Sequence, residues 1–399
     1  MRNQRFNVMQ VIGNLQIGGA QEVVRTLVDY LAWSGCHPIV CTFMDGPMRQ
    51  DIERSGTKVV VLPRRHSIVA FPFFVVDMIR IWRQLAGLIR ENKIDVVQTH
   101  LFDLSTNSLM LLLPYTTDLR LLFWTVHNVD FGPAGSHVSR PKRIVYRSVY
   151  RLASRMANGF IAVSDKVKKA MVEEVDSIED SITVICNGVD VKRYGHPLDK
   201  TKVLSELGLE AGAYSVAVVG TLKEQKGHRY LIEAMSSIVP QYPNCHLLVI
   251  GDGELREELQ AQTERRQLGE NIHFLGNRHD VTDLLAASDL FVLPSLWEGL
   301  PMALIEAMAS GLPIVATQVS GTTQVMLSGE TGILVPPGDT QTLTGAILEM
   351  LSNPERARAM GVAARRHVEE GFSAQRQADE HLDLYHRLWQ QEAEACRAW

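Results

Sequence analysis

Short apolar runs alternate with amphipathic helical segments along almost the whole chain, and this alternation constrains the fold more than any other feature. Parallel strands need long crossover connections, and helices in those connections cover the faces of the sheet. The predicted strands are Phe6–Ile12, Ile39–Phe43, Lys58–Leu62, Ile94–Thr99, Leu121–Val126, Gly159–Val163, Ile182–Ile185, Tyr214–Val219, Cys245–Ile250, Ile272–Leu275, Leu290–Leu293, Ile314–Ala316 and Gly332–Val335. The pattern predicts an α/β protein with parallel sheets.

The alternation lapses once, over residues 191–212, where charged residues, glycine and proline replace it. A chain of 399 residues is also too long for one ordinary core. We therefore predict an N-terminal domain at 1–190, a linker at 191–212 and a C-terminal domain at 213–371. We expect the final helical segment, 372–399, to pack back on the first domain.

Composition is that of a globular protein, with 46% apolar and 21% charged residues. No segment approaches the ~20 uninterrupted apolar residues of a membrane span. Residues 1–14 lack the long apolar core of a signal peptide and instead predict a strand. The five cysteines are scattered and odd in number, which favours neither a disulfide framework nor a Cys-x-x-Cys metal site. We expect a cytoplasmic protein.

Basic residues concentrate in one predicted helix, at Arg140, Lys142, Arg143, Arg147, Arg151 and Arg155. Helical spacing places Arg143, Arg147 and Arg151 on one face. Such a face is either simply solvated or contacts an anionic membrane surface or a lipid phosphate. Nucleic acid is disfavoured, because no aromatic platform or recognition motif accompanies the charge.

In the N-terminal half, polar and glycine residues follow three predicted strands. Gly18 and Gly19 lie after the first strand, as a plain turn or as a point where the backbone approaches a ligand. Gly-x-Gly-x-x-Gly is absent, which disfavours a nicotinamide dehydrogenase. His100 and His127 end two further strands, and open α/β sheets bind ligands at that edge. We favour a functional role for His127 and leave that of His100 open.

In the C-terminal half, Glu298 lies in a loop between the strand Leu290–Leu293 and a helix. Pro301 marks the start of that helix and Gly311 its end, and Glu306 lies more than a turn into it. The unpaired N–H groups at a helix N-terminus suit a phosphate. Two glutamates at this spacing are either a solvated helix face or ligand-binding carboxylates.

Taken in order, several short motifs resemble glycosyltransferase family 4. They are Ile17–Gln21, Thr125–Asn128, Ala162–Ser164, Val184–Asp190, Lys226–Gly227, Ala287–Asp289 and the segment from Glu298 through Gly-Leu-Pro-Met to Glu306. Together they extend over about residues 6–370. The resemblance implies the GT-B fold, an α/β architecture of two facing Rossmann-like domains with a cleft between them.

The resemblance also implies an activity, the transfer of a sugar from a nucleotide-diphosphate sugar with retention of anomeric configuration. The C-terminal domain would hold the donor and the N-terminal domain would meet the acceptor. By the same resemblance, Lys226 would neutralise the diphosphate, and Glu298 and His127 would contact the sugar. The backbone N–H groups at Gly299 and Leu300 would face the sugar and phosphates, and Glu306 would bind the ribose. Gly18 and Gly19 would let the N-terminal loop approach the donor closely, and Arg278 would border the base pocket.

No Asp-x-Asp occurs in the chain, so the usual carboxylate clamp for a divalent metal is not indicated. We expect no metal and no cofactor, with Lys226 carrying much of the charge neutralisation. One departure from the family is Thr221, where many relatives have arginine. Either Lys223, two residues on, supplies the second positive charge to the diphosphate, or the site has lost a cation.

Two alternatives to a transferase remain. A sugar-nucleotide epimerase shares the architecture and would consume donor without acceptor. A non-catalytic sugar-nucleotide-binding protein would bind donor without turnover. Within the transferase class the acceptor is a glycan, a lipid-linked molecule or a small molecule, and the products would serve cell-surface polysaccharide or glycolipid synthesis.

Overall fold

The computed structural model describes residues 5–64, 73–100, 104–127, 140–175, 178–210 and 212–397. The chain forms two compact units, the first comprising Met1–Gly188 and Ala374–Trp399, the second Val189–Ser373. The segment that we expected to be a linker instead lies inside the second unit. Its backbone finds regular hydrogen bonds there, in a 3-10 helix (η2, Val191–Arg193) and in α8 (Lys200–Glu206).

The first unit is built on a parallel sheet of seven strands in the order β3-β2-β1-β4-β5-β6-β7. The strands are β1 (Asn7–Ile12), β2 (His37–Thr42), β3 (Lys58–Val61), β4 (Val96–His100), β5 (Leu121–Val126), β6 (Gly159–Ala162) and β7 (Ile182–Val184). The strand order reverses between β1 and β4, where Ile12 lies opposite His100 and Gln10 opposite Gln98. Such a reversal opens a crevice at the carboxyl ends of the strands.

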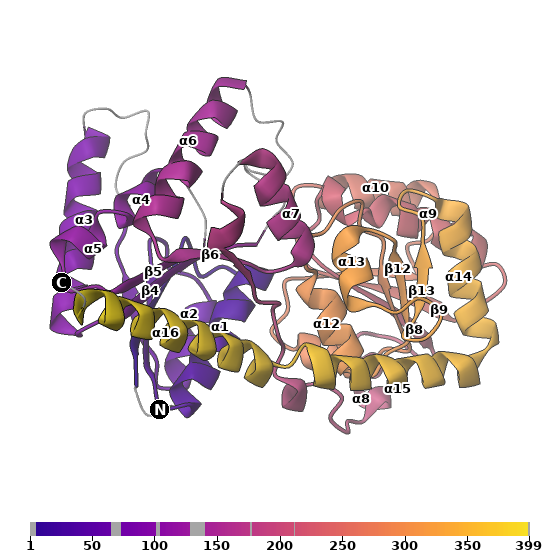
Figure 1. The fold of residues 1–399 in the computed structure, drawn as a ribbon. Helices are drawn as coiled ribbons and strands as arrows, with labels where there is room; N and C mark the ends of the chain where they lie inside the picture. Colours follow the sequence, from indigo (N-terminus) through magenta and orange to yellow (C-terminus); the bar gives the residue numbers. More distant parts are fainter. Residues whose placement is uncertain are drawn as a thin grey trace. The chain divides into compact units, whose positions relative to one another are not determined.

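Helices cover both faces of this sheet (Figure 1). One face carries α1 (Gly19–Trp33), α2 (Met48–Arg54) and α16 (Ala374–Arg397), and α16 packs on α1 and β5. The other carries α3 (Phe73–Glu91), α4 (Leu104–Met110), α5 (Leu113–Thr116) and α6 (Arg140–Met156). The seventh helix, α7 (Asp165–Glu174), packs on β6 and β7. The last helix of the chain therefore completes the core of the first unit.

The second unit has a parallel six-stranded sheet in the order β10-β9-β8-β11-β12-β13. The strands are β8 (Tyr214–Val219), β9 (Cys245–Ile250), β10 (Ile272–Gly276), β11 (Leu290–Leu293), β12 (Ile314–Thr317) and β13 (Ile333–Val335). Here the order reverses between β8 and β11, so the loops that follow these two strands face one crevice.

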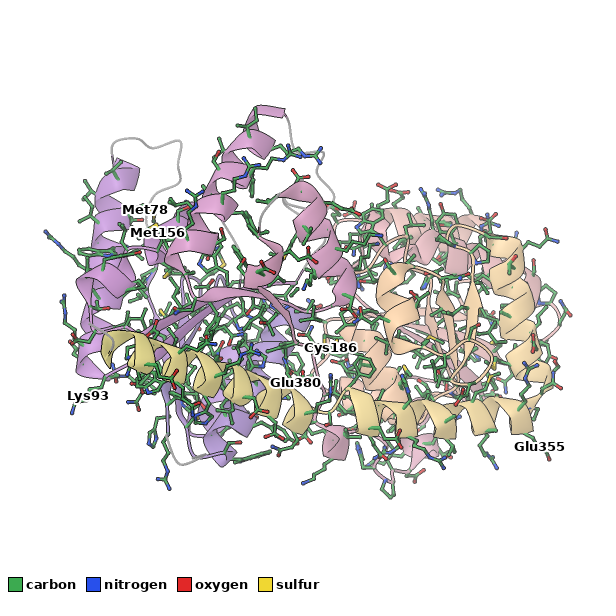
Figure 2. The ribbon with its side chains drawn as sticks, in the orientation of Figure 1. Met78, Lys93, Met156, Cys186, Glu355 and Glu380 are labelled. Atoms are coloured by element: carbon green, nitrogen blue, oxygen red, sulfur yellow. The ribbon has the colours of Figure 1, made fainter. Side chains whose placement is uncertain are left out.

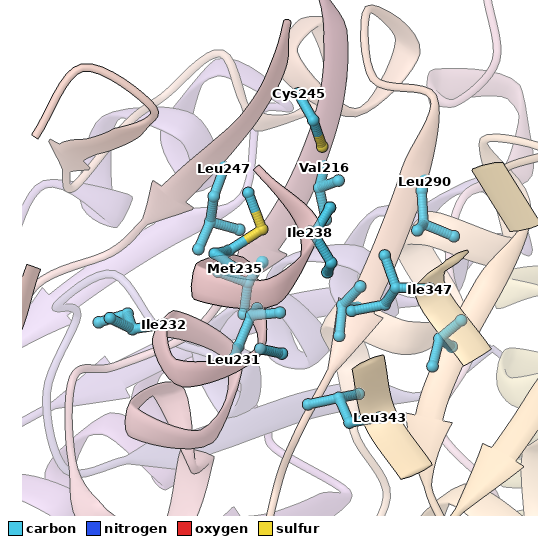
Figure 3. Close-up of a cluster of buried hydrophobic side chains, with 14 of the residues drawn as sticks. Val216, Leu231, Ile232, Met235, Ile238, Cys245, Leu247, Leu290, Leu343 and Ile347 are labelled. Carbon is cyan, nitrogen blue, oxygen red and sulfur yellow. The ribbon is translucent and has the colours of Figure 1, made fainter. Parts of the chain in front are cut away.

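The main core of the second unit lies between the sheet and three helices, α9 (His228–Ile238), α10 (Arg256–Arg265) and α14 (Thr340–Ser352). Leu231, Met235 and Ile347 project from α9 and α14 toward sheet residues such as Val216 and Leu247 (Figure 3). Their burial supplies the hydrophobic free energy that holds the helices on the sheet. The remaining helices are α11 (Val281–Ala286), α12 (Met302–Ala309), α13 (Ser320–Val325) and α15 (Pro354–Gly371).

Four cysteines lie among the described side chains, and none of the four forms a disulfide. Cys36, Cys41 and Cys245 are buried in the two cores, and Cys186 follows β7 (Figure 2). Burial raises the pKa of Cys41 and of Cys245 to about 12, so these thiols stay protonated and unreactive. Cys41 and Cys245 therefore act as small apolar side chains.

Candidate functional site

In the second unit, the candidate site is formed by the two loops at the strand-order reversal. The first loop follows β8 and runs through a 3-10 helix, η3 (Glu224–Lys226), into α9. The second follows β11 and leads into α12. The loops are joined directly, since Leu296 N donates to Gln225 O at 2.7 Å and Gln225 Nε2 donates to Trp297 O at 2.8 Å. These bonds fix the backbone of one loop against the other.

Gly227 allows the two loops to approach this closely. Its φ of +65° is left-handed, and a Cβ at this position would collide with the carbonyl oxygen of Pro294. Both conditions require glycine. A second glycine, Gly321 in α13, contacts the other side of the loop, where a Cβ would lie 2.9 Å from Glu298 Cβ. The position of Glu298 is thus set by backbone packing.

Lys226 and Glu298 form a buried ion pair at the centre of this arrangement. Lys226 Nζ lies 2.7 Å from Glu298 Oε1, and Ser295 Oγ donates to the same oxygen at 2.7 Å. Both side chains are largely removed from water. Two such charges are costly to bury unless each is paired and hydrogen-bonded. The sequence motifs assigned the two residues to separate parts of a substrate, and the structure brings them into direct contact.

Backbone donors lie next to the pair. Gly299 and Leu300 follow Glu298 at the start of α12, and their N–H groups donate no hydrogen bond to any described residue. Pro301 caps the helix rather than occupying its first turn, and Gly311 follows its end with a φ of +75°. Glu306 is buried one turn into the helix. A helix start with unpaired N–H groups beside a lysine suits an anion.

Lys223 lies close to the ion pair. Burial is the largest influence on the pKa of Lys223 and lowers it. The charge of Lys226 lowers this pKa further, whereas the charges of Glu298 and Glu254 raise it. These influences place its ammonium within electrostatic range of both members of the pair. Thr221 is exposed, and its carbonyl accepts a 2.9 Å hydrogen bond from Lys223 N. The loop therefore turns Lys223 inward and Thr221 outward.

Arg278 lies in the loop after β10. Its guanidinium makes two hydrogen bonds to Asp280, at 2.7 Å to Oδ1 and 2.5 Å to Oδ2. This pairing lowers the pKa of Asp280. The paired side chain keeps about a third of its surface exposed, so it retains a stacking face.

In the first unit, the structure brings His100 and His127 together at the ends of β4 and β5. His100 Nδ1 lies 2.9 Å from His127 Nε2, and the rings are stacked with centroids 5.2 Å apart. Burial lowers the pKa of His127 to about 4. Burial also lowers the pKa of His100, with smaller effects from His127 and His381. Both imidazoles are therefore neutral near pH 7. Asn128, the last residue of the Thr125–Asn128 motif, lies outside the described residues.

Gly18 and Gly19 lie at the start of α1 after β1. Gly18 is the residue that precedes the helix, with an extended backbone (φ −178°) that any residue adopts. A Cβ there would meet only the flexible end of the Gln21 side chain. The backbone conformation of Gly18 therefore does not require glycine.

The basic helix predicted around residues 140–155 is α6. Arg143 donates to Glu174 of α7 through Nε at 2.5 Å, and Arg147 does so at 3.1 Å. Both arginines remain about half exposed. On the same helix Ile144, Val145 and Leu152 are also exposed, by 64%, 55% and 49%. The outer surface of α6 is therefore both basic and apolar. The side chains of Arg140 and Lys142 lie outside the described part.

Sequence reasoning missed a group of buried polar residues that are linked by hydrogen bonds to the histidine pair, which Gln10 contacts directly. They are Gln10 and Gln98 in the central strands, and Gln377, His381 and Tyr385 on α16. The available signal was a glutamine in the middle of each of two strands next to valine residues, because a buried amide needs hydrogen-bond partners. The contribution of α16 carries no comparable local pattern.

Across the described ranges, no group of three or more His, Cys, Asp and Glu side chains is arranged to hold a metal ion. Of the helices in those ranges, none combines the length and the apolar character needed to cross a bilayer.

Comparison with known proteins identifies the family. Residues 17–193 match the family described as Glycosyltransferase Family 4, and residues 199–367 match the family described as Glycosyl transferases group 1. The chain belongs to these glycosyltransferases.

Among the relatives, an Escherichia coli enzyme is 28% identical over 306 residues, covering 75% of this chain and 77% of its own. It is a UDP-Gal:alpha-D-GlcNAc-diphosphoundecaprenol alpha-1,3-galactosyltransferase. The alpha-maltose-1-phosphate synthase of Mycolicibacterium smegmatis is 30% identical over 60% of this chain and 66% of its own.

Solved structures show the same fold. HepE of Anabaena, in complex with UDP and glucose, superposes with a TM-score of 0.80 at 22% identity over 99% of this chain and all of its own. WaaG, a glycosyltransferase of lipopolysaccharide biosynthesis, has a TM-score of 0.72 at 18% identity, covering 95% and 99% of the two chains. The architecture is the GT-B fold.

Proposed function

We propose that this chain transfers a sugar from a nucleoside-diphosphate sugar to a hydroxyl of a lipid-linked or glycan acceptor, with retention of anomeric configuration and without a metal ion. The observation that carries the proposal is the buried Lys226–Glu298 pair beside the N–H groups of Gly299 and Leu300. The E. coli relative, named for a UDP-sugar donor and a diphosphoundecaprenol-linked acceptor, supports the substrate class.

In the proposed reaction, the acceptor oxygen bonds to the anomeric carbon while the bond from that carbon to phosphate breaks. The electron pair stays on the departing diphosphate, and the acceptor proton passes to a phosphate oxygen on the same face. Lys226, the N–H groups at the start of α12 and Lys223 stabilise the growing negative charge. Glu298 faces the sugar, where a carboxylate tolerates oxocarbenium character. Glu306 binds the ribose hydroxyls and Arg278 borders the base.

Lys223 takes the place of the arginine that many relatives have at the position of Thr221. Its support is its partly buried side chain and the electrostatic influence of Lys226 and Glu298 on its pKa. Two cations on a diphosphate offset its charge without a metal ion.

The test is incubation of the protein with a panel of labelled nucleotide sugars, with and without a lipid extract, followed by NMR of the product. The proposal expects transfer that needs acceptor, persists in EDTA and gives a product with the anomeric configuration of the donor. Equal consumption of donor without acceptor would instead indicate an epimerase or hydrolase. Binding without turnover would indicate a non-catalytic protein.

The proposal includes peripheral contact between the first unit and an anionic membrane through α6. Exposed apolar side chains beside arginines are the composition of a helix that lies in a membrane interface. Arg143 and Arg147 both form ion pairs with Glu174. We therefore assign the larger part of the membrane-binding free energy to Ile144, Val145 and Leu152.

Liposome co-sedimentation tests this contact. The Ile144→Ser/Leu152→Ser variant should lose binding to anionic vesicles, whereas Val362→Ser, which changes a residue 58% exposed on α15 of the second unit, should not. Equal recovery of the wild-type protein with neutral and anionic vesicles would remove the electrostatic part of the contact.

A further inference from the structure

A continuous chain of buried hydrogen bonds runs through the first unit from His127 to the C-terminal helix. Its members, in spatial order, are His127, His100, Gln10, Gln98, His381 and the carbonyl of Gln377, with Thr125 and Tyr385 attached to Gln98. All except His127 are buried. Buried polar groups are costly when unpaired, so each bond restricts the next.

The direction of the chain follows from the groups themselves. Gln10 Oε1 can only accept, so His100 Nε2, which lies 2.8 Å away, carries the hydrogen. A neutral imidazole has one N–H, so His100 Nδ1 then carries a lone pair. His127 Nε2, 2.9 Å from that lone pair, must therefore donate.

The far end of the chain agrees with this direction. Gln98 Nε2 lies 2.7 Å from Thr125 Oγ1 and 3.2 Å from His381 Nε2, and His381 Nδ1 lies 2.7 Å from Gln377 O. A carbonyl accepts, so His381 Nδ1 donates and its Nε2 accepts from Gln98.

This fixes the orientation of the Gln98 amide and leaves Gln98 Oε1 as an acceptor. Tyr385 donates to that oxygen, and Gln10 Nε2 lies 3.4 Å from it. The amide of Gln10 is thereby oriented by Gln98, with its own oxygen facing His100. Gln98, Tyr385 and His381 therefore act on the histidine pair through Gln10.

Burial keeps the histidines of this hydrogen-bonded series uncharged. It lowers the pKa of His381 to about 4, as it does for His127, and lowers that of His100. Neutral rings are required for the direction derived above, because an imidazolium donates from both nitrogens. At neutral pH each ring therefore has one donor and one acceptor nitrogen.

We propose that Gln10, His100 and Gln98, together with His381 and Tyr385 of α16, are positioning residues. They hold His127 in the neutral tautomer that carries its hydrogen on Nε2. His127 Nδ1, which makes no hydrogen bond to the described residues, then offers a lone pair to a hydroxyl of the transferred sugar. A neutral ring with this tautomer also avoids repelling a sugar carbon that becomes positively charged. The sugar contact rests on the proposed function; the tautomer does not.

The test is NMR of the full-length protein labelled with ¹⁵N-histidine, in which two-bond ¹⁵N–¹H correlations report which nitrogen carries hydrogen. In the wild-type protein without ligand, His127 should show protonated Nε2 and unprotonated Nδ1. Hydrogen on Nδ1, or an equal mixture of tautomers, would overturn the proposal. Because no donor is present, this result stands apart from the outcome of any activity assay.

Substitution of Gln10 gives a directional test. Gln10→Glu places a carboxylate beside His100 and favours its imidazolium, which donates from Nδ1 as well. His127 must then accept at Nε2 and move its hydrogen to Nδ1. We expect this switch together with a fall in kcat/KM of about tenfold, the size of one lost hydrogen bond.

The matched control is Gln375→Glu, the same substitution at an exposed position of α16. It should change neither the tautomer nor kcat/KM. If Gln10→Glu fails to fold, Tyr385→Phe serves instead: it removes one hydrogen-bond donor to Gln98 and should give a mixture of the two His127 tautomers.

If a folded Gln10→Glu protein keeps the wild-type tautomer of His127, the hydrogen-bonded residues do not determine that tautomer. If the tautomers behave as expected but no sugar is transferred, the proposed function fails and the positioning role stands.

Discussion

Lys226 Nζ and Glu298 Oε1 lie 2.7 Å apart, although their residues are 72 positions apart in the chain. The pair joins the loop after β8 to the loop after β11, at the point where the strand order of the second unit reverses. Before a donor binds, each charge is the counter-ion of the other. A diphosphate would compete with Glu298 for Lys226 and leave the carboxylate to face the sugar.

Substitution of Lys226 should affect stability and turnover separately. Lys226→Met leaves the buried Glu298 carboxylate without its cation, which should lower the free energy of unfolding by about 3–5 kcal/mol. Turnover should fall roughly 10²–10³-fold, as for the loss of one oxyanion donor. Denaturant unfolding and steady-state kinetics measure the two effects.

The double variant Lys226→Met/Glu298→Gln separates the two effects of this pair. It removes both charges and should regain much of the stability without regaining activity. Lys169→Met is the matched control, since its partner Glu173 is 3.9 Å away and both side chains are exposed. It should cost less than about 1 kcal/mol. Equal costs for Lys226→Met and Lys169→Met would contradict the importance of the buried pair.

Lys223 should contribute to donor binding. Lys223→Ala is expected to raise the KM for the nucleotide sugar about tenfold, because one cation is lost from the diphosphate. Adding Thr221→Arg to that variant should recover part of the loss. Lys192→Ala removes an exposed lysine of the same unit and should have no effect. Compensation by Lys223 is wrong if Lys223→Ala leaves donor affinity and turnover unchanged while Lys226→Ala abolishes both.

Gly227 and Gly311 offer a matched comparison of two left-handed glycines, with φ of +65° and +75°. Gly311→Ala adds only backbone strain, because nothing lies within 4 Å of the new Cβ. It should cost about 1 kcal/mol. Gly227→Ala adds a collision with Pro294 O and should displace the loop that carries Lys226. A thermal shift and a donor titration should therefore show a larger loss for Gly227→Ala in both measurements, and equal losses would argue against the close approach.

His228 should make stability depend on pH. Burial lowers its pKa to about 3, with a smaller effect of Lys226, and neither ring nitrogen has a hydrogen-bond partner among the described residues. Below the ordinary pKa of about 6.5 the unfolded chain binds a proton here that the folded chain does not, so stability from this group falls as pH drops from 6.5 toward 3.

His228→Leu removes this pH-dependent contribution. The variant should therefore gain stability relative to the wild-type protein by about 2 kcal/mol as the pH falls from 8 to 5. Unfolding titrations at pH 5 and pH 8 measure the difference. If the stability difference between the variant and the wild-type protein is the same at pH 5 and at pH 8, His228 does not have a lowered pKa in the folded protein.

Much of the fold could be predicted because strand burial leaves a local pattern. The runs at Leu121–Val126 and Tyr214–Val219 coincide with β5 and β8, since continuous apolar sequence indicates strands covered on both faces. The segment 191–212 was the main error. Its polar composition suggested a linker, but tertiary contacts place α8 against α11 within the second unit.

The candidate site could be predicted in part. The motifs singled out Lys226, Glu298 and His127, and the strand pattern placed His100 at a strand end, where open sheets bind ligands. They could not show that Lys226 and Glu298 contact each other, or that Tyr385 and Gln98 share a hydrogen bond, since these depend on side-chain packing between distant segments. Local patterns do not record such contacts.

A thermal-shift titration tests whether the second unit binds a nucleoside-diphosphate sugar at Lys226 and Glu298. A ligand that binds the folded state raises Tm with its concentration. We expect at least one nucleotide sugar to raise the Tm of the wild-type protein in a saturable way. The Lys226→Met/Glu298→Gln variant should lose this shift, and Gly311→Ala should keep it. An equal shift in the wild-type protein and the double variant, or no shift with any nucleotide sugar, would show that Lys226 and Glu298 do not form a donor site.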